Sequence, residues 1–314
     1  MARFRSLLSG AKTAFYRRPI DEIKRLHRWG PRAYLRCSAW AAEMEFAAKC
    51  LPLLPHVRSE VVPPLEVWYL TGQRFWYQTA FCAWSLAHHS QRNVVLNLVD
   101  DGSLNPADEH YLRRLFPLGV TLWKSEAIEN LDKHLPAIRF PVLRQRWNDY
   151  INIRKLTDIH LCSSGTKLVL DSDMLFFRRP DALIAWWDQR QNPCLMVDCE
   201  ESYGYSRTLL ERLAGVPLLP SLNVGICGLD SDIIDWDEVE FWCRSLVESE
   251  GTSYYLEQAL FAMLASRHHP TVLERTDYIT CPSPVQAKTG AGVLQHYVAD
   301  SKSLYFRNSW KLLI

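Results

Sequence analysis

The chain has 314 residues, of which 48% are apolar and 23% charged, and its formal net charge is +1. This length and composition indicate a globular protein with a full hydrophobic core and exclude a disordered or low-complexity chain. They also argue against a nucleic-acid-binding protein, which usually carries strong positive charge. No apolar run reaches the roughly 18 residues that a membrane-spanning helix needs.

The N-terminal arm is more basic than the rest of the chain. Residues 1–36 contain ten Lys and Arg side chains but only Asp21 and Glu22 as acids, a net charge of +8, which leaves −7 on the remainder. Such an arm is typical of contact with an anionic membrane or an acidic partner, although a solvated helical face is the alternative. Aromatic side chains in the arm also suit a bilayer surface; they are Phe4, Phe15, Tyr16 and Trp29.

The cysteines indicate a reducing compartment. Nine are present, none in a Cys-x-x-Cys pattern, and Cys82, Cys162 and Cys227 lie in apolar surroundings. Reduced core thiols of this kind are typical of cytosolic proteins. Because the N-terminus also lacks the continuous apolar region of a secretory signal, we expect a cytoplasmic protein that contacts the inner membrane face peripherally through residues 1–36.

The first 62 residues are predicted to be a helical segment separate from the rest of the chain. Apolar residues around Met44 recur at helical spacing, Pro52 ends that pattern, and the Pro63-Pro64 pair marks a boundary. We therefore divide the chain into a basic helical segment, residues 1–62, and a main domain, residues 63–314.

Strands and helices alternate in the main domain. The patterns predict strands at residues 65–70, 94–99, 120–123, 168–170, 194–197 and 221–229 and one ending at His296, and helices at 74–88, 106–116, 125–134, 144–161, 180–188 and 254–265. This alternation indicates an α/β fold with a doubly wound, mostly parallel sheet. Ligands of such sheets bind beyond the carboxyl ends of the strands. Thr71, Gly72 and Asp100 come at the ends of the first two strands and are expected there.

Asp171 and Asp173 lie one residue apart, where the buried run that ends at Leu170 leaves the core. Two carboxylates at this spacing can converge on one divalent cation. Oxygen ligands suit Mg²⁺ or Mn²⁺ that also holds a diphosphate. The alternative is that these side chains cap a turn, and the pair alone leaves both interpretations open.

Further residues occur in an order that carries a family resemblance. They are Leu170-Asp171-Ser172-Asp173, Asn223-Val224-Gly225, Glu257-Gln258, and His296 with Lys302 six residues later. In this order the chain resembles retaining glycosyltransferases of the GT-A fold, above all glycosyltransferase family 8 and its distant relatives. The resemblance runs from about residue 65 to residue 310 and implies a Rossmann-like GT-A domain. It also implies an enzyme that moves a hexose from a nucleoside diphosphate sugar, expected to carry UDP, to an acceptor hydroxyl with retention.

The resemblance implies a metal and diphosphate site. Asp171, Asp173 and His296 would hold Mn²⁺, or Mg²⁺, on the diphosphate, with Ser172 in the same segment. Lys302 and Arg154 would contact the phosphates. The alternatives are a polar histidine at a strand end, a solvated loop lysine and an arginine paired with a carboxylate inside the fold; Lys155 is a close rival of Arg154.

The resemblance also implies contacts with the sugar. Glu257 would bind sugar hydroxyls, Gln258 would lie near the anomeric carbon, and Asn223 would contact donor or acceptor hydroxyls. The family has Asp where this chain has Glu257, so the pocket is expected to differ in shape; a glutamate in the first turn of a helix also interacts favourably with the helix dipole. The acceptor, whether a glycan, a lipid-linked or a protein hydroxyl, is not specified.

The chain departs from the family in three places. Its first strand continues into Thr71-Gly72-Gln73-Arg74, whereas the family has small and acidic residues that read uracil, so the diphosphate is better supported than uridine. Ala299 replaces a glycine between His296 and Lys302, and Ser303-Leu304 replaces a Pro-Trp pair. These differences indicate a divergent member.

Two other functions use similar sequence features. A sugar-phosphate nucleotidyltransferase also places carboxylates on a doubly wound sheet, but it usually has a glycine-rich basic loop after the first strand, which residues 70–74 match poorly. A non-catalytic nucleotide-sugar-binding protein would keep the site without turnover.

Overall fold

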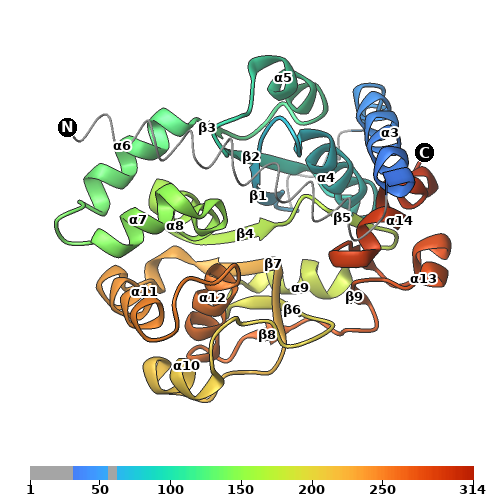
Figure 1. Cartoon of the computed structure of the whole chain (residues 1–314). Coiled ribbons are helices and arrows are strands. Elements are labelled where there is room, and N and C mark those ends of the chain that lie inside the picture. Colours follow the sequence, from blue (N-terminus) through green and yellow to red (C-terminus); the bar gives the residue numbers. More distant parts are fainter. Residues whose placement is uncertain (1–30, 56–61) are drawn as a thin grey trace.

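The computed structural model describes residues 31–55 and 62–314 (Figure 1). The basic arm up to residue 30, on which the expectation of membrane contact largely depends, lies outside the described residues. No described helix is both long and apolar enough to cross a membrane.

The core of the fold is a seven-stranded sheet of order β3-β2-β1-β4-β7-β6-β8. Its strands are β1 (Leu65–Thr71), β2 (Val94–Asp100), β3 (Thr121–Leu122), β4 (Thr166–Leu170), β6 (Cys194–Val197), β7 (Leu222–Asp230) and β8 (Thr271–Val272). Neighbouring strands run parallel except β7, which runs antiparallel to both β4 and β6. The predicted α/β class and mostly parallel sheet are therefore confirmed.

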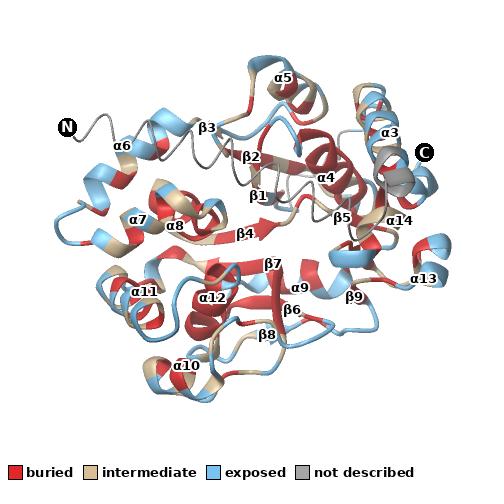
Figure 2. Cartoon of the chain, viewed as in Figure 1, coloured by how far each residue is buried: buried red, intermediate tan, exposed pale blue. Residues whose placement is uncertain are grey.

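Helices cover both faces of this sheet. One face carries α3 (Pro31–Lys49), α4 (Trp76–Ser90), α5 (Pro106–Leu115), α9 (Asp181–Gln189) and α14 (Lys302–Arg307). The other carries α6 (Lys124–His134), α7 (Pro141–Asp149), α8 (Arg154–Cys162), α10 (Arg207–Ala214), α11 (Trp236–Glu250) and α12 (Leu256–Ser266). The sheet is the most deeply buried layer (Figure 2).

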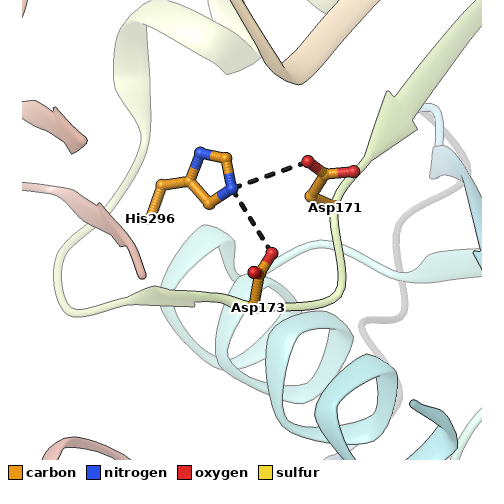
Figure 3. A group of neighbouring side chains, drawn as sticks. All are labelled: Asp171, Asp173 and His296. Carbon is orange, nitrogen blue, oxygen red and sulfur yellow. Dashed lines mark ion pairs between the residues drawn. The ribbon is translucent and has the colours of Figure 1, made fainter. Parts of the chain in front are cut away.

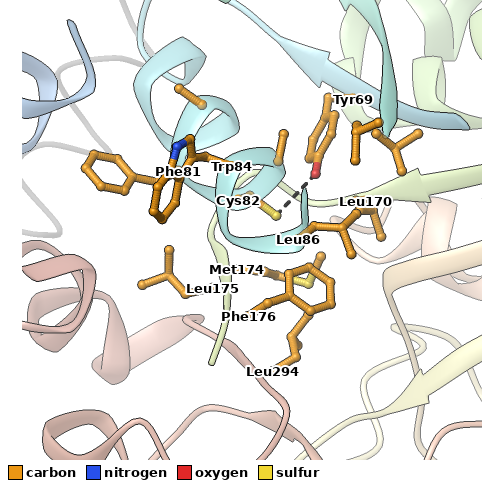
Figure 4. Close-up of a cluster of buried hydrophobic side chains, with 14 of the residues drawn as sticks. Tyr69, Phe81, Cys82, Trp84, Leu86, Leu170, Met174, Leu175, Phe176 and Leu294 are labelled. Atoms are coloured by element: carbon orange, nitrogen blue, oxygen red, sulfur yellow. Dashed lines mark hydrogen bonds between the residues drawn. The ribbon is translucent and has the colours of Figure 1, made fainter. Parts of the chain in front are cut away.

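Successive side chains of the central strands enter opposite cores, because strand side chains alternate between the two faces of a sheet. In β4, Leu168 and Leu170 pack on the α4 side, whereas Val169 packs on the α8 side. The α4-side core surrounds Tyr69, whose hydroxyl donates to Cys82 Sγ at 3.3 Å (Figure 4). This double coverage explains why the strand before the two aspartates is a continuous apolar run.

The helix predicted at residues 144–161 is broken in the structure. The chain forms α7, an extended residue at Tyr150, a 3₁₀ turn over Ile151–Ile153 and then α8. Asn148, Asp149 and Asn152 are weak helix formers, and they surround the break. The break sets the direction in which the first residues of α8 face.

A second, smaller sheet continues from the end of β4. It contains β5 (Met174–Phe176), β10 (Leu294–His296) and β9 (Tyr278–Thr280), with β10 antiparallel to β5 and parallel to β9. The last helix before β10 is α13 (Pro284–Thr289). This pairing brings the C-terminal strand beside the segment that carries the two aspartates.

The described part of the N-terminal segment shares the main core. Helix α3 packs against α4 and α14 (Figure 1). Met44 and Ala48 have no exposed surface, and Leu51 after the helix has 1%. The division at residue 62 stays a prediction, but α3 has no core of its own apart from the sheet domain.

Candidate active site

Asp171, Asp173 and His296 converge at the carboxyl end of β4 (Figure 3). Asp171 directly follows β4, Asp173 directly precedes β5, and His296 ends β10 opposite Met174. One ligand atom from each of the three lies within 4.8 Å of the others. The Nε2 atom of His296 is 3.5 Å from Asp171 Oδ2 and 3.3 Å from Asp173 Oδ1. We call this group the metal triad.

The neighbours of His296 determine which ring nitrogen faces the aspartates. Asn223 Nδ2 donates to Asp198 Oδ2 at 2.9 Å, which leaves Asn223 Oδ1 as an acceptor for the Gly225 amide at 2.8 Å and for His296 Nδ1 at 3.1 Å. Nδ1 therefore carries a proton, and Nε2 faces the aspartates. Burial alone would lower the pKa of His296, but Asp173 and Asp171 raise it above its usual value. Nε2 would give its lone pair to a cation on losing its proton. This buried Nε2 has no hydrogen-bond partner. Two carboxylates and an imidazole nitrogen are a ligand set that suits a divalent cation.

Two lysines neutralise the carboxylates. Lys302 Nζ pairs with Asp173 Oδ2, and Lys155 Nζ lies 2.5 Å from Asp171 Oδ1. Burial opposes ionisation of Asp173, but Lys302 and His296 outweigh it and hold the pKa of Asp173 well below its usual range. Burial likewise lowers the pKa of Lys155, yet Asp171 and Glu257 together raise it well above the usual value. The Lys155 ammonium group therefore stays charged at neutral pH.

The first turn of α12 supplies polar groups next to the triad. Glu257 Oε1 lies 3.5 Å from Lys155 Nζ. Burial raises the pKa of Glu257 to about 7, although Lys155 opposes the shift. Gln258 Nε2 donates to Asp198 Oδ2 at 3.3 Å and to the Leu222 carbonyl at 3.1 Å. Asp198 therefore orients the amides of both Asn223 and Gln258.

Two hollows meet at the metal triad. The first, about 610 Å³, is lined by Asp198, Asn223, Glu257 and Gln258, and we call it the α12 hollow. The second, about 740 Å³, extends past Ser172 to the turn after β1 and to helix α3, and we call it the α3 hollow. Both are also lined by Lys155, Lys302 and the two aspartates of the triad. The triad thus lies between two hollows that share the lysines and aspartates but differ in their other lining residues.

The structure does not bring Arg154 to this cleft. Its side chain is buried, Nε lies 2.7 Å from Asp158 Oδ2, and the guanidinium stacks 4.6 Å from the Trp147 ring centroid. Consecutive residues of a helix face directions about 100° apart. Since α8 begins at Arg154, Lys155 faces the aspartates and Arg154 faces the core. The alternative of an internal arginine–carboxylate pair describes Arg154 correctly.

Three further predicted residues lie beneath the cleft rather than in it, and two of them shape turns. Asp100 Oδ1 accepts from the backbone amides of Gly102 and Leu104, at 2.7 and 2.9 Å, and so stabilises a turn. A Cβ at Gly72 would lie 2.0 Å from Asp101 Oδ1, so glycine permits close packing there. Neither Asp100 nor Gly72 lines the α12 hollow or the α3 hollow.

Thr71, the third, belongs to a chain of hydroxyl groups below the aspartates. Its Oγ1 lies 2.8 Å from Thr79 Oγ1, which in turn lies 2.8 Å from Ser172 Oγ. Of the three hydroxyl residues, Ser172 reaches the α3 hollow. Thr71 therefore supports the segment between the aspartates from below and does not face the hollow itself.

Sequence reasoning missed Asp198 and ranked Lys155 second. Asp198 directly follows the predicted strand at 194–197, and the position after a strand is the signal that also marked Asp171. Nothing in the sequence around Lys155 distinguishes it from Arg154, because which of the two side chains faces the cleft depends on where α8 begins.

Neither a family model nor a curated protein sequence matches the chain. Solved structures are similar: mouse xyloside xylosyltransferase 1 in its apo form matches with 13% identity and a TM-score of 0.52 over 76% of this chain and 98% of that chain. The WbbM bifunctional glycosyltransferase, apo, matches with 9% identity and a TM-score of 0.51 over 82% of this chain and 52% of that one.

Galactosyltransferase LgtC, in complex with donor and acceptor sugar analogs, matches with 12% identity and a TM-score of 0.49 over 75% of this chain and 88% of that one. At identities this low, structural similarity shows a shared fold alone. The chain has the GT-A fold, as the sequence resemblance predicted.

Proposed function

We propose that this GT-A protein is a metal-dependent glycosyltransferase that moves a hexose from a nucleoside diphosphate sugar to an acceptor hydroxyl, with retention. The observation that carries the proposal is the position of the metal triad and its two lysines at the junction of two hollows. A diphosphate bound at that junction would direct its nucleoside into one hollow and its sugar into the other. UDP-hexoses are the first donors to test.

The triad suits a divalent cation that binds phosphate oxygens. Mn²⁺ and Mg²⁺ prefer a few protein ligands together with phosphate and water. The two carboxylates and the Nε2 atom of His296 that faces them are such a partial ligand set. When bound, the cation would supply positive charge that neutralises the leaving diphosphate.

Lys155 and Lys302 are the chain's own groups for the leaving phosphate. Negative charge grows on the diphosphate as the anomeric carbon–oxygen bond breaks, so fixed cations beside it stabilise the transition state more than the ground state. Each ammonium group is already held by an aspartate of the triad, and both line the two hollows. They therefore require little reorganisation to bind phosphate oxygens.

The α12 hollow suits the transferred sugar. Gln258 would lie beside the anomeric carbon, with its amide oriented by Asp198, while Glu257 and Asn223 would bind hydroxyls. In a front-face reaction the acceptor oxygen bonds to the anomeric carbon on the side that the diphosphate leaves. The departing phosphate oxygen takes the acceptor's proton, so a separate base is not needed.

The experiment is release of nucleoside diphosphate from a panel of nucleotide sugars with Mn²⁺, Mg²⁺ or EDTA. We expect metal-dependent release from one donor, reduced about a thousandfold in Asp173→Ala. The matched control is Asp232→Ala, which alters an exposed aspartate in a 3₁₀ turn outside both hollows. Release that persists in EDTA or in Asp173→Ala would contradict the proposal. Pyrophosphate release from a nucleoside triphosphate and a sugar phosphate would indicate a nucleotidyltransferase instead.

The basic arm supports a second part of the proposal. Ten basic side chains within residues 1–36 would hold the protein on an anionic membrane face and bring the cleft to a membrane-linked acceptor. The support is the charge and aromatic content of the sequence.

A further inference from the structure

Helix α3 precedes the part of the chain that resembles glycosyltransferases, yet it forms one wall of the α3 hollow. Ser38, Ala41 and Glu45 line the hollow and recur at helical spacing on one face. The neighbouring face carries Cys37, Met44 and Ala48, which are buried in the main core. The core contacts therefore hold the lining residues of α3 in a fixed position over the cleft.

The chemistry of the two hollows indicates which half of the donor enters each. The α12 hollow presents Glu257, Gln258 and Asn223, which match the hydroxyls of a sugar. The α3 hollow begins at the carboxyl end of β1 and includes Phe75, a residue that is 40% exposed and whose ring can stack on a flat base.

Gln78, on the first turns of α4, gives the α3 hollow a polar group that lacks a partner. The residue is 2% exposed and lines the hollow. Its Nε2 donates to the Arg74 carbonyl at 3.3 Å, whereas its Oε1 has no hydrogen-bond partner. A buried acceptor without a partner is unfavourable, and an N–H group of a bound base would satisfy it.

We propose that α3 is a wall of the nucleoside subsite, and that Gln78 Oε1 accepts a hydrogen bond from an N–H of the donor's base. The inference rests on the proposed function, because the diphosphate at the metal triad determines where the nucleoside lies. The N-terminal helix is then a determinant of donor binding as well as a packing element.

The test fills the subsite from α3. Ser38→Trp and Ala41→Trp each place an indole at the hollow, and Ala39→Trp places the same side chain on an exposed face of α3 outside it. Calorimetry with Mn²⁺ then gives the Kd for UDP, GDP and inorganic pyrophosphate. We expect the Kd for the nucleotides that bind the wild type to rise about tenfold or more in the two lining variants and to stay unchanged in Ala39→Trp. The Kd for pyrophosphate should stay unchanged in all three.

Gln78→Leu tests the subsite in a second way, because leucine removes the acceptor without filling the hollow. It should raise the Kd for nucleoside diphosphates about threefold to tenfold, the effect of one lost hydrogen bond, without changing the Kd for pyrophosphate. Thermal melts of all four variants confirm that each is folded.

Three outcomes would overturn the inference. Nucleotide binding unchanged in the lining variants and in Gln78→Leu would remove α3 and Gln78 from the subsite. An equal loss for pyrophosphate would mean that the substitutions disturb the metal centre. If the wild type binds nucleotides no better than pyrophosphate, the α3 hollow makes no nucleoside contact although the diphosphate site stands. Binding of neither ligand by the wild type would instead defeat the proposed function itself.

Discussion

At the scale of single residues, Arg154 and Lys155 are neighbours on α8 with different surroundings: Arg154 lies in the core and Lys155 lies in the cleft. Arg154 pairs with the fully buried Asp158, whose carboxylate also accepts from Trp147 Nε1 at 2.6 Å. Lys155 reaches into the cleft toward Asp171 and Glu257. The two cations are adjacent in the chain but have different surroundings.

Substitution of each by methionine should therefore have different effects, mainly on stability for Arg154 and mainly on kcat for Lys155. Arg154→Met leaves the charge of Asp158 buried without its partner and should lower the free energy of unfolding by about 3 to 5 kcal/mol. Lys155→Met should lower kcat about a hundredfold with a smaller loss of stability, because its charge acts on the leaving phosphate. Urea unfolding and initial rates on the active donor measure both. A Lys155→Met protein with unchanged kcat would contradict the role given to Lys155.

Glu257 should make stability depend on pH when metal is removed with EDTA. Its folded pKa of about 7 is raised above the usual value of 4.5. The folded state therefore binds the proton more tightly, and the resulting stabilisation is complete below pH 4.5 and lost as the pH rises to 7. The free energy of unfolding should fall by about 1 kcal/mol per pH unit across this window relative to Glu257→Gln. Parallel curves for the two proteins would show that Glu257 does not titrate this way.

At the scale of elements, strand β7 positions two residues of the metal triad, Asp171 and His296. The Gly225 carbonyl accepts from the Asp171 amide at 2.8 Å, and Asn223, two residues earlier, orients His296. A Cβ at Gly225 would lie 2.5 Å from His296 Nδ1. Glycine at this position lets the imidazole reach the aspartates.

Gly225→Ala should displace His296 and weaken Mn²⁺ binding about tenfold to a hundredfold, as changes beside metal ligands do. Gly228→Ala on the same strand is the matched control, because its Cβ would overlap the Trp186 ring, 2.2 Å away, rather than a ligand of the triad. The control should lose about 1 to 3 kcal/mol of stability and keep its Mn²⁺ affinity. Calorimetric titration with Mn²⁺ measures both variants. Equal affinities would show that His296 does not depend on Gly225.

At the scale of the whole molecule, α3 links the basic arm to the site. A chain that begins at residue 60 would lose Met44 and Ala48, which have no exposed surface in the main core. Such a truncation would test folding more than membrane contact. Substitution within the arm is the better experiment.

Replacement of the eight Lys and Arg residues up to Arg28 by glutamine should abolish binding to phosphatidylserine-containing vesicles. Polybasic segments gain about 1 kcal/mol per basic residue near an anionic surface, and salt screens that attraction. Flotation of the wild type and the substituted protein, at low and high salt, measures the effect. Equal flotation of the two would remove the arm as a membrane contact, while equal thermal melts would show that α3 still packs.

Local sequence patterns were enough to predict the fold class and the positions of several strands. The buried run before Asp171 and the alternation of strands and helices predicted the parallel sheet, and the strand predicted at residues 194–197 has the bounds of β6. The position of Asp171 and Asp173 after a buried strand marked two residues of the metal triad, whereas His296 and Asn223 were expected from the family resemblance. Such signals lie within short stretches of chain, so a sequence records them directly.

Long-range packing decided the rest. Side-chain alternation is the same in either strand direction, so the sequence could not show that β7 runs antiparallel to its neighbours. The phase of α8, set by the break near Tyr150, turned Lys155 into the cleft and Arg154 into the core. Docking of α3 on α4 and α14 made an N-terminal helix part of the hollow beside the metal triad. Each outcome depends on contacts between segments far apart in the chain, which only the folded molecule brings together.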